Sequence, residues 1–211
     1  MPIQNFNNET FVAFIDISGF KELMKDTENG LKALKRLYQS GYDALLNSDG
    51  VEGFFVSDCG ILFVRNGNNT EKLIKILSVI KIINSKMLER NYMLTTSISF
   101  GHFHYHNKLE FDGIEKNPIY GNAYVKSFLD NETGIPRIQP GQCRIITKDL
   151  PEEINLDDIS FNLLKRKNNG KHLYYYWNLN QENEISNFEK QYNDSYKSKY
   201  SGMLQALKNE E

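Results

Sequence analysis

The chain has 211 residues, of which 40% are hydrophobic, 12% are aromatic and 25% are charged. This composition is typical of a soluble globular protein and excludes a disordered or fibrous one. Because 25 Lys and Arg face 27 Asp and Glu, the net charge of -2 offers a polyanion no general attraction, and we expect no nucleic acid partner.

A single domain is expected for this length, with a core at about residues 10–178 and a polar helical tail at about 183–211. The N-terminus is polar and the longest apolar run, 73–83, contains Lys75 and Lys81, so no membrane partner is expected. Cys59 and Cys143 need not pair, because a chain of this size can bury a full core without a disulfide. They predict a reducing compartment, and we expect the cytoplasm.

The first part of the chain predicts a strand, a helical segment and a hairpin. Residues 10–17 read TFVAFIDI, an apolar run typical of a buried strand, with Asp16 as its only charge. Apolar residues at helical spacing over 20–47 predict two helices with a break at Asn29-Gly30. Short apolar runs at 52–56 and 60–64 predict an antiparallel hairpin with Asp58 at its tip.

The remaining elements complete an α+β pattern. A helix capped by Thr70 is expected to reach Met87, followed by a strand at 93–105 and a short helix at 122–131. Short strands are expected at 143–147, 161–164 and 173–177, and a terminal helix at 185–207. The order up to residue 131 predicts a ferredoxin-like or palm fold, an antiparallel sheet with helices packed on one face.

Two acids are candidates for chemistry. Asp16 ends the first strand and Asp58 lies at the hairpin tip, so pairing of these strands would bring their carboxylates together. Facing carboxylates repel each other, whereas two divalent cations between them would form a clamp for a triphosphate and a deprotonated hydroxyl. The alternative is that each is an ordinary turn or cap aspartate, since Asp is a favoured turn residue.

The flanking residues support the first interpretation. Residues 14–20, FIDISGF, and 56–58, VSD, resemble the two metal motifs of the class III nucleotidyl cyclases. The resemblance implies that Asp16, Ile17 and Asp58 hold two divalent cations, Mn²⁺ or Mg²⁺. In the turn after Asp16, successive backbone N–H groups offer a site for the β- and γ-phosphates. The residues of this predicted phosphate site are Ile17, Ser18, Gly19 and Phe20.

Further segments resemble one branch of that family, the pyrimidine cyclases of bacterial Pycsar anti-phage systems. They are Ser57 in place of the usual glycine, SFG at 99–101, YGNAYVKSF at 120–128 and PRI at 136–138. The resemblance implies a homodimer that converts UTP or CTP into 3′,5′-cyclic UMP or cyclic CMP and pyrophosphate. The product would be an anti-phage second messenger that reaches its effector by diffusion.

Several positions depart from the purine cyclases of the family. Phe54 and Pro118 stand where adenylyl cyclases carry a base-reading lysine and aspartate, and Phe54 could stack on a smaller base, although an aromatic there is also a good strand residue. Val125 and Leu129 replace the Asn and Arg that stabilise the transition state in many members. We take Arg137 as the replacement catalytic cation, because a guanidinium can contact phosphate oxygens as a fork.

Other interpretations stay open. Lys171 is a weaker phosphate-binding candidate, and we favour the alternative that it is a solvated lysine of the charged stretch 165–171. A non-catalytic nucleotide-binding or dimerisation module and a purine nucleotidyl cyclase are the alternative functions; a dinucleotide cyclase would need a Gly-Gly-Asp/Glu-Glu-Phe hairpin, which is absent. His102, His104 and His106 alternate on a predicted strand, but we disfavour a metal site there because no further ligand lies nearby in the sequence.

Overall fold

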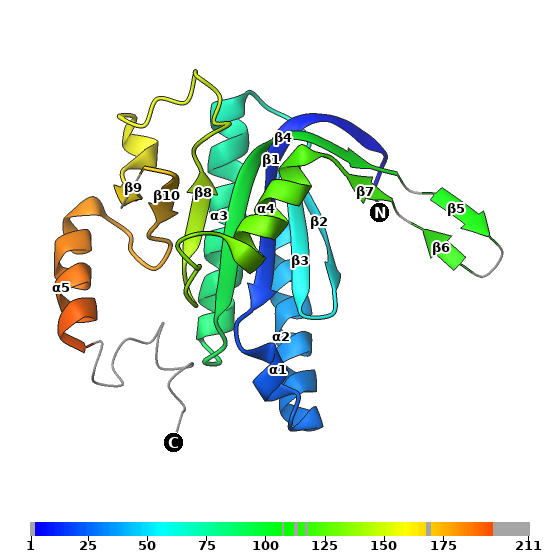
Figure 1. Cartoon of the computed structure of the whole chain (residues 1–211), viewed down its shortest axis with the longest axis horizontal. Helices are drawn as coiled ribbons and strands as arrows, with labels where there is room; N and C mark the ends of the chain where they lie inside the picture. The colour runs from blue at the N-terminus through cyan, green and yellow to red at the C-terminus, as the bar shows by residue number, and fades with distance from the viewer. Residues whose placement is uncertain (1–2, 107, 112–113, 117, 168–169, 196–211) are drawn as a thin grey trace.

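The computed structural model describes residues 3–106, 108–111, 114–116, 118–167 and 170–195. A mixed sheet with the strand order β2-β3-β1-β4-β8-β10-β9 forms its centre, and β7 also pairs with β4 (Figure 1). These strands are β1 (Phe6–Ile17), β2 (Val51–Val56), β3 (Cys59–Val64), β4 (Leu94–Tyr105), β7 (Ile119–Tyr120), β8 (Cys143–Ile146), β9 (Leu164–Lys167) and β10 (His172–Tyr175). Only the β4–β8 pair is parallel among the described strands.

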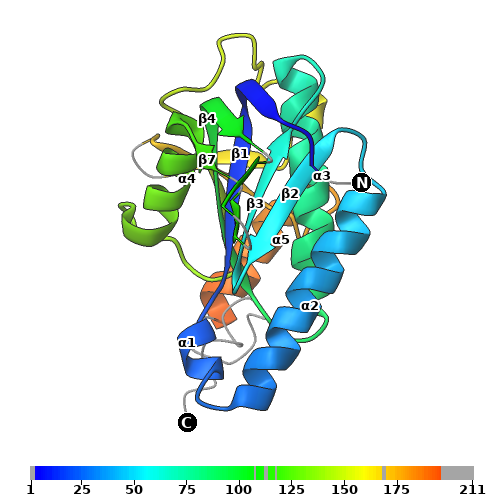
Figure 2. The same cartoon turned by 90° about the vertical axis from the view of Figure 1, so that its right-hand side faces the viewer.

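The helices lie on both faces of this sheet. They are α1 (Phe20–Leu23), α2 (Thr27–Leu46), α3 (Asn69–Leu88), α4 (Asn122–Thr133) and α5 (Ile185–Ser195), with short 3-10 turns η1 (Ile159–Phe161) and η2 (Glu182–Glu184). Figure 2 shows α2 and α3 on one side of the sheet and α4 on the other. A separate hairpin, β5 (Lys108–Phe111) and β6 (Ile114–Lys116), projects from the end of β4 (Figure 1).

Strand β1 is buried on both sides because its side chains alternate between two apolar clusters. Phe11, Ala13 and Ile15 face the larger cluster, which contains residues of α2 and α3. Val12 and Phe14 face the smaller cluster, which includes Ala123 of α4. The α+β fold with helices packed on an antiparallel-rich sheet is therefore confirmed, whereas the expectation that helices cover only one face is wrong for α4.

Two helix starts differ from their predicted positions, because side chains cap the backbone earlier. Asp26 accepts hydrogen bonds from the N–H groups of Glu28 and Asn29, so α2 starts before the predicted break and Asn29-Gly30 lies inside it. A Cβ at Gly30 would come within 2.4 Å of the Met24 sulfur, so the Met24 side chain would have to move to accept any larger residue. Helix α3 is capped by Asn68, whose capping box includes Glu71, and not by Thr70.

The C-terminal part departs furthest from prediction. The expected strand at 161–164 is instead the end of η1, a two-residue turn and the first residue of β9, because Asp158 caps a 3-10 turn through the Ser160 N–H. Helix α5 begins at the predicted residue, Ile185, and is described to Ser195; the predicted part beyond it lies outside the described residues. No described helix is long and apolar enough to span a membrane.

Candidate active site

The ends of three paired strands place the two acids side by side. Asp16 is the Cα partner of Cys59 in β3 and of Thr95 in β4, so these side chains share one face of the sheet. Asp58 lies in the turn before Cys59, and its carbonyl oxygen accepts a hydrogen bond of 3.0 Å from the Ile17 N–H. One ligand atom each of Asp16, Asp58 and Cys59 lies within 4.8 Å of the others.

The turn that presents Asp58 also accounts for the sequence departure at Ser57. Ser57 has a φ of 55°, in the left-handed region that favours glycine. Glycine adopts this conformation at little cost, which explains why it suits the position before the second acid. Ser57 adopts the same turn with a Cβ, so the departure leaves the geometry of the hairpin tip intact.

The electrostatics of Asp16 fit a cation. Burial, followed by the nearby charges of Asp58 and Glu132, raises the pKa of the Asp16 carboxyl to about 7. A divalent ion would offset this repulsion, and carboxylate oxygens are the ligands that Mg²⁺ and Mn²⁺ prefer. The side chains of Asp16 and Asp58 therefore form a suitable donor set for a metal, whereas the side chain of Ile17 is buried and could contribute only backbone atoms.

The predicted phosphate turn is only partly available. The N–H of Ile17 donates to Asp58 O, and the N–H of Ser18 donates to Met93 O at 2.8 Å, so these two amides already have partners within the protein. The amides of Gly19 and Phe20 have no backbone partner in the described part of the chain. Gly19 has a φ of 73°, which places these two N–H groups in a tight turn before the short helix α1.

A cleft of about 510 Å³ opens beside Asp16, and we call it the Asp16 cleft. Its lining residues are Asp16, Ser18, Gly19, Thr95, Asn131, Glu132, Arg137, Ile138, Gln139 and Pro140. The structure thus brings Arg137 into the same cleft as the first acid, although the two are 121 positions apart in the chain. Sequence reasoning did not single out Asn131, whose Oδ1 accepts a hydrogen bond from Thr95 Oγ1 at 2.9 Å.

Asp58, Ile17 and Phe20 adjoin lining residues of the Asp16 cleft without lining it themselves, whereas Lys171 and Phe54 lie elsewhere. Lys171 lines a second cavity, of about 420 Å³, together with Asp130 and His172. Phe54 lies on β2, and its ring centroid is 5.7 Å from that of Tyr105. Their assignment to nucleotide binding remains a prediction, and each would have to act on a nucleotide that extends beyond the Asp16 cleft.

The helix that covers this face presents no charged group at the two positions where the resembled family carries its Asn and Arg. Val125 and Leu129 of α4 are 47% and 49% exposed. Neither side chain can donate a hydrogen bond, so these positions supply no cation for phosphate chemistry.

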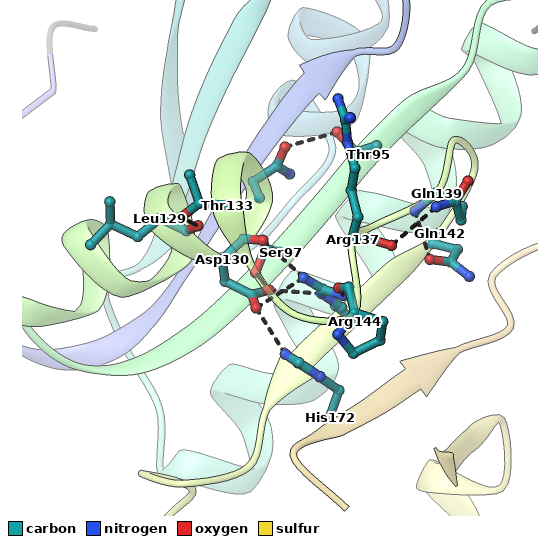
Figure 3. A network of polar contacts seen from close by, with 12 residues as sticks. Thr95, Ser97, Leu129, Asp130, Thr133, Arg137, Gln139, Gln142, Arg144 and His172 are labelled. Atoms are coloured by element: carbon teal, nitrogen blue, oxygen red, sulfur yellow. Dashed lines mark hydrogen bonds and ion pairs between the residues drawn. The ribbon is translucent and has the colours of Figure 1, made fainter. Parts of the chain in front are cut away.

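A buried ionic network centres on Asp130, the residue before Asn131 of the Asp16 cleft (Figure 3). The fully buried Arg144 forms a fork with the Asp130 carboxylate, with Nε–Oδ2 and Nη2–Oδ1 distances of 2.8 and 3.0 Å. Asp130 also contacts His172 Nε2 at 2.8 Å and accepts from the Ser97 hydroxyl at 2.5 Å. Burial raises the pKa of the Asp130 carboxyl, but hydrogen bonds from His172, Ser97 and Arg144 outweigh it and the net shift is downward.

This network, which we call the Asp130 network, was missed because its members come from four separate elements. The available signal was Arg144 itself, a lone charge in the otherwise apolar segment CRII of β8. A charge in a buried strand requires a partner.

The histidines of β4 do not gather as a metal site. The rings of His104 and Tyr120 stack at 4.4 Å, and the rings of His102 and His104 lie 6.5 Å apart. Within the described ranges, the group formed by Asp16, Asp58 and Cys59 meets the spacing required of a metal centre, and the three histidines do not.

No protein-family model and no curated protein matches the sequence. Solved structures match the fold. The adenylyl cyclase CyaB from P. aeruginosa has a TM-score of 0.53 at 17% identity, covering 69% of this chain and 80% of its own. The guanylyl cyclase Cya2 has a TM-score of 0.58 at 11% identity, with 82% and 92% covered.

The guanylate cyclase domain of RhGC from Catenaria anguillulae, in complex with GTP, has a TM-score of 0.55 at 13% identity, with 82% and 97% covered. At these identities the likeness shows the fold alone. The chain therefore has the fold of an adenylyl or guanylyl cyclase domain, with an acid pair at the end of its paired strands.

Proposed function

We propose that this protein is a nucleotidyl cyclase that converts a pyrimidine nucleoside triphosphate, UTP or CTP, into its 3′,5′-cyclic monophosphate and pyrophosphate. The observation that carries this proposal is the close pair of Asp16 and Asp58 beside a cleft that also contains Arg137, on the fold of a cyclase domain. Acids held together against their own repulsion have a direct use as ligands of divalent cations.

The reaction requires charge neutralisation and alignment more than covalent help from the protein. The ribose 3′-oxygen forms a bond to the α-phosphorus while the bond from that phosphorus to the bridging oxygen of the β-phosphate breaks. Pyrophosphate leaves with the bonding electrons, and the hydroxyl proton passes to water. Held by Asp16 and Asp58, two Mn²⁺ or Mg²⁺ ions would acidify the hydroxyl and neutralise the triphosphate. The amides of Gly19 and Phe20 would bind phosphate oxygens.

Selectivity for a pyrimidine base rests on Phe54 and Pro118. Neither offers the hydrogen-bonding side chain with which a purine could be read, and the ring of Phe54 narrows the space for a base. Because Phe54 and Lys171 lie outside the Asp16 cleft, we propose that a homodimer completes the nucleotide site. From the sequence resemblance we also propose an anti-phage role, in which the cyclic product diffuses to an effector in the cytoplasm.

The test is an assay of purified protein with ATP, GTP, CTP and UTP, each with Mn²⁺ or Mg²⁺, with products identified by mass spectrometry. We expect cyclic UMP or cyclic CMP and pyrophosphate, and little cyclic purine nucleotide. Cyclic AMP or cyclic GMP as the main product would overturn the base assignment. Absence of every cyclic product, with a folded and metal-binding protein, would overturn the cyclase proposal.

A non-catalytic nucleotide-binding module is the second candidate, favoured by the apolar Val125 and Leu129 on α4. It predicts that nucleoside triphosphates bind and are recovered unchanged. Calorimetric binding in the absence of turnover would identify this case, whereas turnover would exclude it.

A further inference from the structure

Asn131, near the end of α4, carries an unsatisfied donor at the wall of the Asp16 cleft. The residue is only 7% exposed, and its Nδ2 has no hydrogen-bond partner in the described part of the chain. Its Oδ1 is already engaged by Thr95 Oγ1, which fixes the orientation of the amide. The hydroxyl of Ser18, another lining residue, is also buried without a partner. Orphaned buried donors are costly, so their presence at one cleft indicates a ligand with acceptor atoms.

Arg137 adds a positive charge to the same cleft. Its side chain is exposed, and the described residues provide its guanidinium with no ion pair. In Figure 3 Arg137 extends past Thr95, whereas Arg144 turns away toward Asp130. The backbone around Arg137 is held on both sides, because Arg144 Nη1 donates to Pro136 O at 2.6 Å and Gln139 Nε2 donates to Arg137 O at 3.2 Å. The backbone that carries this cation is therefore held in place at the Asp16 cleft, which Asp16 also lines.

The strand register places Asn131 near Asp16 of its own chain. Asp16 and Thr95 are directly paired on β1 and β4, and Thr95 holds Asn131. One chain thus brings Asp16, Asn131 and Arg137 to the same cleft. Lys171 lines the other cavity, so the same chain does not bring it to this cleft.

We propose that Asn131 and Arg137 bind the phosphates of a nucleoside triphosphate held at Asp16 and Asp58 of their own chain. This inference rests on the proposed cyclase function and assigns its phosphate donors to the subunit that carries the metal ligands. Arg137 binds non-bridging oxygens and offsets the charge that grows on pyrophosphate as the bond to the α-phosphorus breaks. The Asn131 amide donates a hydrogen bond to one of the same oxygens.

The first experiment measures binding of pyrophosphate with Mn²⁺ by calorimetry, without any turnover. Arg137→Ala and Asn131→Asp should each weaken binding at least about tenfold, because the first removes a cation and the second replaces a donor with a carboxylate that repels phosphate oxygens. Asn131→Asp keeps the acceptor for Thr95. Arg166→Ala, on the edge strand β9, and Asn180→Asp, at an exposed position where Oδ1 accepts from Lys81, are the matched controls and should bind as the wild type does. Unaltered binding in both cleft variants would overturn the assignment.

The second experiment distinguishes action within one chain from action across a dimer, using co-expressed chains with two affinity tags. A heterodimer of Asp16→Asn with Arg137→Ala should stay inactive, because neither chain keeps both groups. A heterodimer of wild type with the double variant Asp16→Asn/Arg137→Ala should keep about half the wild-type activity, since one chain is complete. Donors that act on the partner would give the reverse of both results and would overturn the proposal.

A wild type that makes no cyclic nucleotide would refute the proposed function and leave the pyrophosphate measurement to decide the binding role. A wild type that is active as a monomer would establish by itself that the donors act within one chain. An active wild type whose Arg137→Ala and Asn131→Asp variants keep the wild-type kcat and KM would refute the inference and leave the function standing.

Discussion

Asp16 carries the largest electrostatic constraint of the candidate site, because burial and two nearby acids act on the same carboxyl. It ends a buried strand, and Asp58 and Glu132 both act on it. An ionised carboxylate is unfavourable there, so Asp16 either binds a proton, which removes its charge, or binds a cation, which offsets it. Occupancy by proton or metal is therefore expected to be linked to pH.

The metal-free protein should lose stability as pH rises through the range of this titration. The pKa of Asp16 is raised from 3.8 to about 7, so between these values the folded state keeps a proton that the unfolded state releases. The free energy of unfolding contributed by Asp16 therefore falls from about pH 4 to about pH 7 and then levels off. Urea unfolding in EDTA at pH 5 and pH 8 would measure this.

The comparison variants are Asp16→Asn, which removes the titration, and Asp49→Asn, which alters an exposed acid in a surface ion pair. Above pH 7 the first should be more stable than the metal-free wild type, and the second should follow the wild type. Mn²⁺ should then stabilise the wild type and not Asp16→Asn. A wild type that gains stability between pH 5 and 8 relative to Asp16→Asn would contradict the expectation.

Removal of either acid should abolish turnover without unfolding the protein. Asp16→Asn and Asp58→Asn each change one ligand atom at nearly constant volume, and we expect cyclase activity to fall on the order of a thousandfold because metal charge stabilisation is worth several kcal/mol. Circular dichroism would verify the fold, and Asp49→Asn should keep full activity. Near-normal activity of either acid variant would exclude metal catalysis at this pair.

We expect Phe54 to select the base of the nucleotide, and the adjacent Phe55 provides a control. Phe54→Ala should raise the ratio of purine to pyrimidine product even if total activity falls, since stacking is lost and crowding is relieved. Phe55 points to the other face of β2, where its ring packs against Tyr38. Phe55→Ala should cost stability and leave the ratio unchanged. An unchanged ratio in Phe54→Ala would place base selection elsewhere.

At the scale of elements, the Asp130 network fixes α4 relative to the strands beside the Asp16 cleft. Asp130 lies in α4, Ser97 in β4, Arg144 in β8 and His172 in β10, so one carboxylate joins the helix to three strands. Asn131 follows Asp130 directly, and Arg144 also holds the carbonyl of Pro136. The network therefore positions both proposed phosphate donors through the backbone, without touching the ligand itself.

Loss of the buried arginine should destabilise this region strongly. Arg144→Leu leaves the carboxylate of Asp130 buried without its fork, and we expect a loss of about 3–5 kcal/mol in the free energy of unfolding. Lys32→Met, which breaks an exposed pair with Glu28 on α2, should change it by less than about 0.5 kcal/mol. Urea titrations would measure both, and a loss below 1 kcal/mol for Arg144→Leu would show that the network is dispensable.

At the scale of the whole molecule, α4 leaves apolar side chains in the open. Val125, Phe128 and Leu129 are between 37% and 49% exposed on one helix that packs against the sheet with its other face. Together with a nucleotide site whose predicted parts lie in two cavities, this surface favours contact with a second copy of the chain.

Charge placed on that surface should separate the proposed dimer. Leu129→Glu is expected to shift the protein toward monomer in sedimentation and to lower specific activity, because a buried unpaired carboxylate opposes association. Ile159 is 81% exposed in the distant turn η1, and Ile159→Glu should leave both the mass and the activity unaltered. A Leu129→Glu variant that stays dimeric would place the interface on another surface.

The sequence alone determined the features that depend on short-range patterns. The order of elements predicted the α+β fold. The apolar run 10–17 that ends near Asp16 and the tight hairpin around Asp58 predicted that the two acids lie close together. Both predictions were possible because strand alternation and turn chemistry act over a few residues. Helix starts shifted by a few residues, because Asp26 and Asn68 capped the backbone earlier than the apolar pattern indicated.

Only the tertiary structure decided which face of the sheet α4 covers and which residues lie near Asp16. The contact of Asp130 with His172 spans 42 residues, and Arg137 reaches the Asp16 cleft through a loop whose backbone is held by Arg144. Such contacts arise from the packing of a helix and three strands at once, and no local periodicity in the sequence encodes them. The unpaired Nδ2 of Asn131 is a property of the same packing, since a polar atom is orphaned only by the neighbours that surround it.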